Sequence, residues 1–462
     1  MVAGNGDLIA LVAEAGFSRR ELARWVNTVA ERRGLHLGCS HTSVARWLEG
    51  AQPRWPIPEL LAEALGRRLG CELTVADLGL CDRRPPTPDS FDGLNVARTA
   101  AEVRHAVAEL SERDMNRRTF LANTAFGVGA FAAPALFWST ASRAEGEPER
   151  LTSHGPTTVR DADVLRIHQT VLAFRRLDRA QGGGDLRDTV VNHLNGVART
   201  KLAGSYGEEV GRRLFRAVAE LTELAGWLSF DSGRHALAQR YHIQALRLAQ
   251  AADDPAYGAY VMANMACQAV YLGHGWEAVQ LARAADQGAG DKLGPRARAI
   301  VAAMEARGYA AMGDRRACER AMGVAERHLD AAGAIEDDPS WCNYFDESEL
   351  QHEFAHSHRD LGLPEKIHGF AGESIKLRRA GASRRCAQDT TFMAAAHLAQ
   401  GDLDAACLKA TDALRIAGNL SSAQCNDFLA DFRRRLRPYG REPIARAFSE
   451  EADQVMGDLA AA

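Results

Sequence analysis

The sequence predicts an all-α protein, with a small N-terminal helical domain followed by a long α-solenoid of stacked helix pairs. Strand signals are scarce, and apolar residues recur at the three- and four-residue spacing of helices. A serine-capped helix pair lies near the N-terminus, and five segments of the C-terminal two-thirds repeat one grid of small residues. We therefore expect a domain over residues 1–82, a connecting part over 83–160 and a repeat domain over 161–462.

The composition is that of an ordinary soluble globular protein. The chain has 462 residues, of which 46% are hydrophobic and 25% charged, enough for two or three domains. The formal net charge of −4 excludes a wholly basic nucleic-acid coat but allows one DNA-binding module. Nine scattered cysteines without a CxxC pair indicate neither a zinc ribbon nor a disulfide framework. They fit a reducing cytoplasm, and residues 1–20 carry no apolar signal core.

The stretch "FSRRELARWVNTVAERRG" predicts the first of two N-terminal helices. Ser18 followed by Glu21 forms a capping box, which satisfies free N–H groups at a helix start. The apolar face of this helix comprises Leu22, Trp25, Val26 and Val29.

The stretch "CSHTSVARWLEG" predicts a short second helix, capped by Ser40 and ended by Gly50. Val44, Trp47 and Leu48 face inward in this prediction. A third helix, "PIPELLAEALGRRLG", supports the pair.

This order of helices resembles the lambda-repressor-like helix-turn-helix domain of bacterial regulators, most closely in the pattern from Ser40 to Gly50. The resemblance covers roughly residues 6–80 and implies a recognition helix in the major groove of double-stranded DNA. The two caps are 22 residues apart here, where the family has about eleven, so the insertion "NTVAERRGLHL" should lengthen the first helix and its turn. The residues to which the resemblance assigns DNA contacts are Arg19, Arg20, Ser40, His41, Thr42, Ser43 and Arg46.

The connecting part contains a linker, "RRPPTPDS", a predicted helix over 94–113 and an apolar segment over 117–139. Arg117 and Arg118 open that segment in the manner of a twin-arginine export signal. It could span a membrane, or serve for export from a translation start at Met115. The interpretation that we favour is a segment packed against the repeats or a second protomer, because its alanines and glycines permit close helix contact.

Five C-terminal segments share a turn glycine, at Gly233, Gly273, Gly313, Gly362 and Gly401. The successive spacings are 40, 40, 49 and 39 residues. Small residues recur seven before, five after and twelve after each glycine, except at Ile367. Two closely packed antiparallel helices need small residues where their backbones approach and a glycine in the turn. Residues 161–210 predict further helices, and Arg433 to Met456 a closing cap.

This grid resembles the tetratricopeptide repeat, with longer helices. In that family the concave groove is lined by residues ten, six and three positions before the turn glycine. A mixed aromatic and cationic groove suits a peptide, an acidic small molecule or a protein partner. The groove residues that the resemblance implies include Glu223, Trp227, Phe230, Cys267, Arg307, His352, His356 and Arg359.

The segment "HEFAH", from His352 to His356, matches the H-E-x-x-H signature of zinc peptidases. Two imidazoles one helical turn apart can share a metal, with Glu353 as the base. The motif lies in register with the repeat grid, so we expect groove residues here and no bound metal.

The whole arrangement resembles actinobacterial regulators that combine a helix-turn-helix head, an internal twin-arginine-like segment and tetratricopeptide-like repeats. Some members restrain sporulation and antibiotic production. The resemblance implies a transcriptional regulator, a homodimer without cofactor or catalytic residues, whose repeats bind an effector or oligomerise. The alternatives are a protein-interaction scaffold without sequence-specific DNA binding and a zinc hydrolase using the HEFAH motif.

Overall fold

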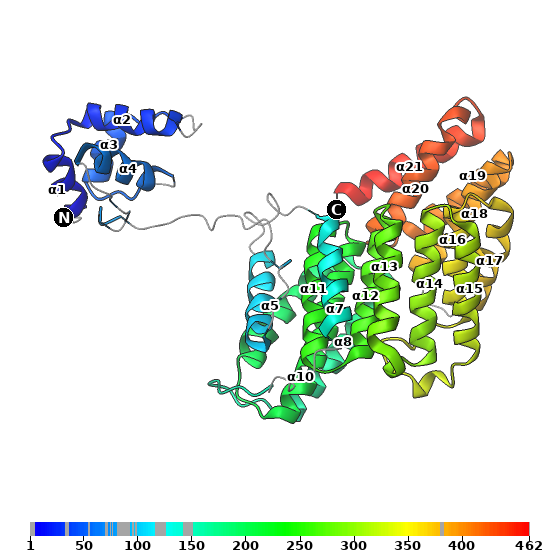
Figure 1. The fold of residues 1–462 in the computed structure, drawn as a ribbon. Coiled ribbons are helices and arrows are strands. Elements are labelled where there is room, and N and C mark those ends of the chain that lie inside the picture. The colour runs from blue at the N-terminus through cyan, green and yellow to red at the C-terminus, as the bar shows by residue number, and fades with distance from the viewer. Residues whose placement is uncertain are drawn as a thin grey trace. The chain divides into compact units, whose positions relative to one another are not determined.

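The computed structural model describes residues 5–32, 37–53, 56–69, 73, 75, 77–80, 93–94, 97, 99–115, 126–141, 151–378 and 383–461. The chain divides into two compact units, Met1–Asp89 and Ser90–Ala462, and each is described by itself. Across the described ranges the regular structure is helical and no strand occurs, apart from two isolated bridges near Ser153 and Thr158. The prediction of an all-α chain is confirmed (Figure 1).

The N-terminal unit begins with α1 and continues with the three helices that the sequence predicts. The bounds are α1 Gly6–Glu14, α2 Arg19–Arg32, α3 His41–Leu48 and α4 Ile57–Leu69. The capping box is present: the Ser18 backbone N–H donates to Glu21 Oε2 at 2.9 Å, and the Glu21 N–H donates to Ser18 Oγ at 3.3 Å. These bonds, first the one with the Ser18 side chain, lower the pKa of Glu21.

The core of the N-terminal unit is built from the predicted inward faces. Leu22, Val26, Val29 and Val44 are fully buried, and Trp47 is nearly so. They pack with α1 and α4 in one apolar cluster. Trp25 and Leu48 lie only half-buried at its edge.

The Asn27 side chain of α2 bonds the backbone of Cys39, just before α3. The Asn27 amide donates to the Cys39 carbonyl and accepts from the Cys39 N–H, both at 3.0 Å. The insertion does lengthen the first helix, because α2 extends to Arg32. The two helices thus form a fixed pair despite the long spacing between their caps.

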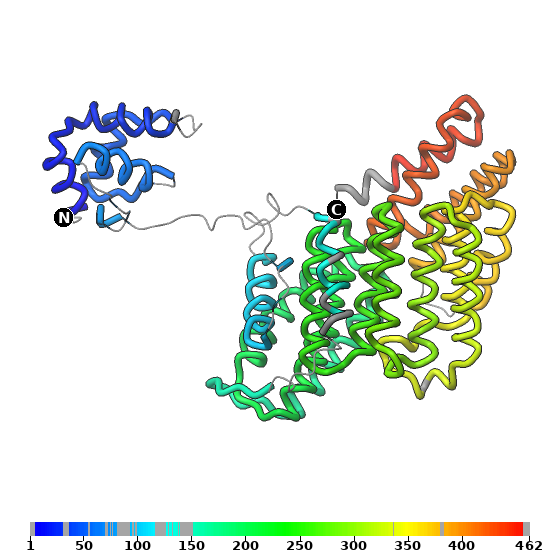
Figure 2. Tube along the Cα trace, viewed as in Figure 1, coloured from blue at the N-terminus to red at the C-terminus, as the bar shows by residue number. Residues whose placement is uncertain are grey.

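In the second unit, ten helices form five antiparallel pairs that run side by side in chain order (Figure 1). Figure 2 follows the same order along the trace. The pairs are α10 Glu208–Asp231 with α11 His235–Ala251, α12 Pro255–Tyr271 with α13 Gly275–Ala289, α14 Pro295–Ala311 with α15 Arg315–Asp330, α16 Glu347–Asp360 with α17 Pro364–Leu377, and α18 Ser383–Ala399 with α19 Leu403–Ala417.

The repeat grid is confirmed at each of its positions. All five turn glycines have positive φ, between 68° and 85°, which a residue with a side chain rarely adopts. The small residues around them are buried at the helix crossings, and even Ile367 is 4% exposed. The observed stack therefore matches a solenoid-like, all-α architecture.

Helices also precede and follow the five pairs, as predicted. Before them come α8 Asp161–Gln181, α9 Gly184–Val197 and the π-helical turn η2 Ala198–Leu202. After them come α20 Ala423–Leu436, the turn η5 Arg437–Tyr439 and α21 Pro443–Ala461. Two further short turns, η3 Gly290–Lys292 and η4 Ile335–Asp337, lie in loops between pairs.

The described parts of the connecting segment pack on the repeats. The helix predicted over 94–113 is α5 Ala100–Met115, which begins later because Thr99 Oγ1 accepts the Glu102 N–H at its start. It packs on α9 and α11. The apolar segment forms the turn η1 Val128–Phe131 and α7 Ala132–Ala141, which packs on α13. Arg117 and Arg118 lie outside the described residues.

Within the described residues, no helix combines the length and apolarity needed to cross a bilayer.

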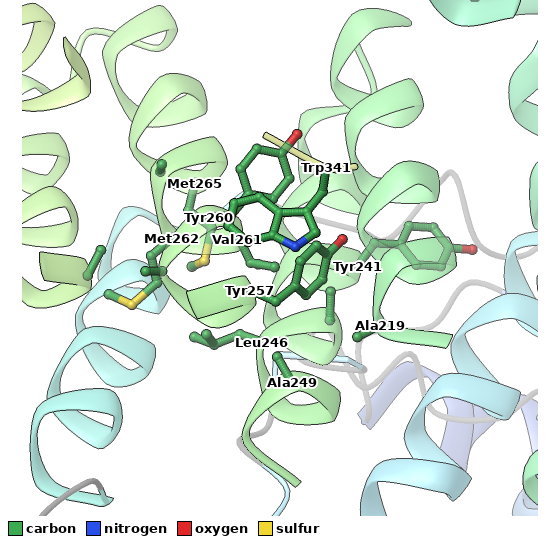
Figure 3. Packing of buried hydrophobic residues seen from close by; sticks show 14 of the residues in the cluster. Ala219, Tyr241, Leu246, Ala249, Tyr257, Tyr260, Val261, Met262, Met265 and Trp341 are labelled. Carbon is green, nitrogen blue, oxygen red and sulfur yellow. The ribbon is translucent and has the colours of Figure 1, made fainter. Parts of the chain in front are cut away.

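An aromatic cluster lies in the core of the repeats. The rings of Tyr257 and Tyr260 of α12 lie against Trp341, with their centroids 5.7 Å and 5.1 Å from that of the Trp341 ring (Figure 3).

Candidate functional site

The N-terminal end of α3 is organised by the hydroxyl of Ser40. Ser40 Oγ accepts the Ser43 N–H at 3.4 Å and lies 2.6 Å from Thr42 Oγ1. Ser40 is therefore engaged in capping, and both Ser40 and Ser43 are half-buried. The cap leaves the first turn of α3 ordered with its outer side chains in solvent.

The remaining residues assigned to DNA contact are exposed on the N-terminal unit. Arg19 and Arg20 open α2, and His41, Thr42 and Arg46 occupy the outer side of α3. Within the described residues, none of the three arginines has an ion-pair partner. Their charges are available to a ligand, and their role in DNA contact stays a prediction.

The second unit contains a cavity of about 530 Å³ on the side of the first helices of the pairs. Its walls come from α8, from α10, α12, α14, α16 and α18, and from the loop between α15 and α16. Each of the five pairs thus contributes its first helix to these walls. Two of the predicted groove residues, Trp227 and Cys267, line the cavity.

The cavity lies closer to the N-terminal ends of these helices than the groove positions that the sequence predicts. Tyr260 and Ile300 are thirteen residues before their turn glycines, and Asn264 and Met304 are nine before. All four line the cavity, with Tyr344 from the loop. The loop supplies a wall at this level, which a regular repeat would lack.

Two predicted groove residues, Glu223 and Phe230, lie in the helix packing, and a third, Arg359, is half-buried. Glu223 is fully buried, where its carboxylate accepts from Arg175 at 2.5 Å and from the Asn264 amide at 2.8 Å. Phe230 is fully buried. The Arg359 guanidinium lies over the ring of Phe428, 4.7 Å from its centroid.

The HEFAH side chains are held by neighbouring residues. His352 Nδ1 lies 2.6 Å from Asp389 Oδ1. Glu353 pairs with Arg307 at 3.2 Å, and the same guanidinium donates to His356 Nε2 at 3.0 Å. In the described part of the chain, no cluster of three or more potential metal ligands occurs. The polar side chains of the motif are therefore buried because they bond their neighbours.

Burial sets the protonation of this cluster. It lowers the pKa of His352 well below its ordinary value and that of His356 to about 4, so both imidazoles are neutral at pH 7. Burial also raises the pKa of Asp389 to about 7. A neutral His356 can accept at Nε2 from Arg307, consistent with its 3.3 Å approach to Asp360 through Nδ1.

Arginines form the polar wall of the cavity, and buried carboxylates hold them. Arg384 bonds Asp178 at 2.8 Å and Asp231 at 3.1 Å. Burial disfavours the charged Arg384, but the two carboxylates outweigh it and raise its pKa. Arg385 donates to Glu349 at 2.8 Å, and its pKa is raised for the same reasons. These guanidinium groups remain charged at all accessible pH values.

The sequence prediction missed these arginines and the loop. Two signals could have found them. Arg175–Arg176 and Arg384–Arg385 each place two adjacent arginines on a helix, and the helix of the second pair is otherwise rich in small residues. The spacing of 49 between Gly313 and Gly362, where the others are 39 or 40, marks an insertion that contains Tyr344.

The comparisons with known proteins concern the N-terminal unit. The family model described as "SP15 N-terminal domain" matches residues 8–81. No curated protein and no solved structure matches the chain. The matched residues span α1 to α4, so the chain is similar to that domain over its N-terminal unit.

Proposed function

We propose that this chain is a DNA-binding transcriptional regulator. In this proposal it is cytoplasmic and dimeric, its N-terminal unit reads double-stranded DNA, and its repeats bind an effector. The observation that carries the proposal is the outer side of α3, where His41, Thr42 and Arg46 stand in solvent above a buried Val44–Trp47 face. A short capped helix on a compact helical support can enter a major groove.

Each exposed side chain has a chemistry suited to base edges. The forked guanidinium of Arg46 can donate two hydrogen bonds to guanine, and the Thr42 methyl can contact the methyl of thymine. Arg19 and Arg20, at the start of α2, can neutralise phosphates.

The nearly balanced charge of the N-terminal unit favours DNA binding by two copies over binding by one. Residues 1–85 contain 11 arginines and 10 carboxylates, so one copy neutralises few phosphates. Two copies would double the contacts and read two half-sites about one helical turn apart. An effector in the repeats would then regulate binding only if it favoured one arrangement of the two N-terminal units.

Arg46→Ala in the purified full-length protein tests the proposal by selection from a random pool of DNA duplexes. The wild type should enrich a near-palindromic site. The variant should lose that enrichment, because each bidentate arginine–guanine contact contributes about 1–3 kcal/mol. Its thermal stability should not change, since Arg46 is exposed.

Arg67→Ala is the matched control, because Arg67 is an exposed arginine of α4 that pairs with Glu63. It should enrich the same site as the wild type. No enriched site with the wild type, together with a stoichiometric protein partner on the repeats, would replace the proposal with the interaction-scaffold alternative.

A further inference from the structure

We infer that the cavity in the repeats binds a small organic anion, in which a carboxylate or phosphate is joined to a flat apolar group. The inference rests on the proposed function in that it names the chemical class of the effector. The cavity volume of about 530 Å³ falls within the range of about 300–1,000 Å³ typical of small-molecule sites.

The charge of the cavity wall favours an anion. Among the described lining residues, six are arginines and three are carboxylates. The arginines are Arg175, Arg176, Arg179, Arg378, Arg384 and Arg385. Several carboxylates that hold them, including Glu223 and Asp231, lie behind the wall and not in it.

Two of these arginines present a surplus of positive charge. Arg176 and Arg179 of α8 line the cavity without an ion-pair partner in the described residues. Arg179 is half-buried, and its guanidinium lies over the Tyr344 ring at 5.2 Å from the centroid. It is held in place by the ring, with no carboxylate to neutralise it.

Buried donors without acceptors provide a second, independent observation. The Nε–H groups of Arg175 and Arg384 have no hydrogen-bond acceptor among the described residues, although both residues are more than nine-tenths buried. An unsatisfied buried donor on a charged group is costly. Both Nε atoms are sealed from the cavity as it stands, so a bound oxyanion could accept from them only after a local shift of the wall.

Aromatic rings supply the apolar half of the site. Trp227 and Tyr260 line the cavity together with Tyr344. Arg384 lies over Trp227 at 5.3 Å, so a cation and a ring are paired here as Arg179 and Tyr344 are. A ligand with a flat group and an oxyanion would place the flat group against the rings and the oxyanion on the guanidinium groups.

An extended peptide fits this cavity less well. The Asn264 amide, which could have clamped a peptide backbone, donates to Glu223 at 2.8 Å. Asp178 of α8 and Arg384 of α18 also line the cavity and bond each other at 2.8 Å, which joins these two walls. A compact ligand is therefore favoured over a chain that continues along the helices.

Calorimetric titration of the full-length protein with naphthoate and with naphthyl phosphate tests the inference. Naphthamide is the neutral ligand of matched shape. One or both anions should bind once per chain, and naphthamide at least about 10-fold more weakly. The two anions distinguish a carboxylate site from a phosphate site.

Arg179→Gln should weaken binding of the preferred anion about 10-fold, with no loss of thermal stability, because Arg179 is in no buried ion pair. Arg320→Gln, an exposed arginine on α15, should bind as the wild type does. Binding of naphthamide as tight as that of the anions, an unchanged affinity in Arg179→Gln, or no anion binding at about 1 mM would overturn the inference.

The same preparations are used in the DNA selection, with and without the anion, so the two proposals fail separately. Enrichment of a DNA site without anion binding would overturn the ligand class alone. Anion binding without any enriched DNA site would overturn the regulator proposal and leave the cavity as a ligand site.

Discussion

Gly226 shows how much a single small residue decides in this fold. It lies where α10 crosses α11, and a Cβ there would stand 2.6 Å from His242 Cδ2 and 3.2 Å from Tyr241 Cβ. Both neighbours are fully buried. Gly226→Ala should therefore destabilise the repeats by about 1–3 kcal/mol in urea unfolding, despite its better helix propensity.

Gly369→Ala is the matched control for that substitution. Gly369 lies inside α17, and a Cβ there would meet nothing within 4 Å. Here helix propensity alone acts, and we expect a gain of up to about 1 kcal/mol. Equal effects of the two substitutions would show that the close approach of α10 and α11 does not require Gly226.

At this scale, the sequence predicts well where small residues lie at the helix crossings. The positions of Ala266, Ala306, Ala355 and Gly226 follow from one rule about backbone approach, and all are buried at the crossings. The Arg175–Glu223 pair could not be predicted in this way. It joins residues 48 apart in the chain, and neither has a local spacing that indicates its partner.

At the scale of elements, Trp138 anchors α7 on the repeats. Trp138 is 4% exposed and lies against two glycines, Gly258 of α12 and Gly288 of α13. A Cβ at Gly288 would stand 1.9 Å from Trp138 Nε1, and one at Gly258 would stand 2.1 Å from Cη2. The missing side chains form the recess that accepts the indole.

Gly288→Ala should release α7 from this recess and leave the helix pairs folded. The clash costs about 1–3 kcal/mol, so hydrogen exchange over residues 132–141 should accelerate about 10- to 100-fold. Gly372→Ala in α17, where a Cβ has open space, should not alter exchange in α7. Unchanged exchange in Gly288→Ala would mean that other contacts hold α7.

The same element marks a limit of sequence-based prediction. Alanine and glycine in the apolar segment predicted close packing on the repeats, and α7 packs on α13. The composition could not indicate that the decisive glycines, Gly258 and Gly288, lie on the partner helices. The cavity was displaced from its predicted level for a similar reason, since Tyr344 enters it from an inserted loop.

At the scale of the whole repeat unit, the two ends of the helix array meet. A solenoid ordinarily has contacts only between neighbouring repeats. Here α8 packs on α18, and Arg384 of α18 bonds Asp178 of α8 and Asp231 of α10. Backbone bonds join Gly184 to Ser421 and Ser421 to Gln181 at 2.8 Å and 2.9 Å. Asp178 and Arg384 are 206 residues apart, so no repeat spacing could predict their contact.

Arg384→Ala tests whether this contact makes the repeats unfold as one body. It would leave Asp178 and Asp231 buried without their cation, at a cost of about 3–5 kcal/mol. We expect urea unfolding to begin at lower denaturant and to broaden, with α8 and α18 losing hydrogen-exchange protection before α12 to α15. Arg415→Ala removes an exposed arginine near Asp412 and Glu451, and should cost at most about 1 kcal/mol. If Arg384→Ala lowers the free energy of unfolding by less than about 1 kcal/mol and leaves one sharp transition, the helix pairs are held together without the contact between α8 and α18.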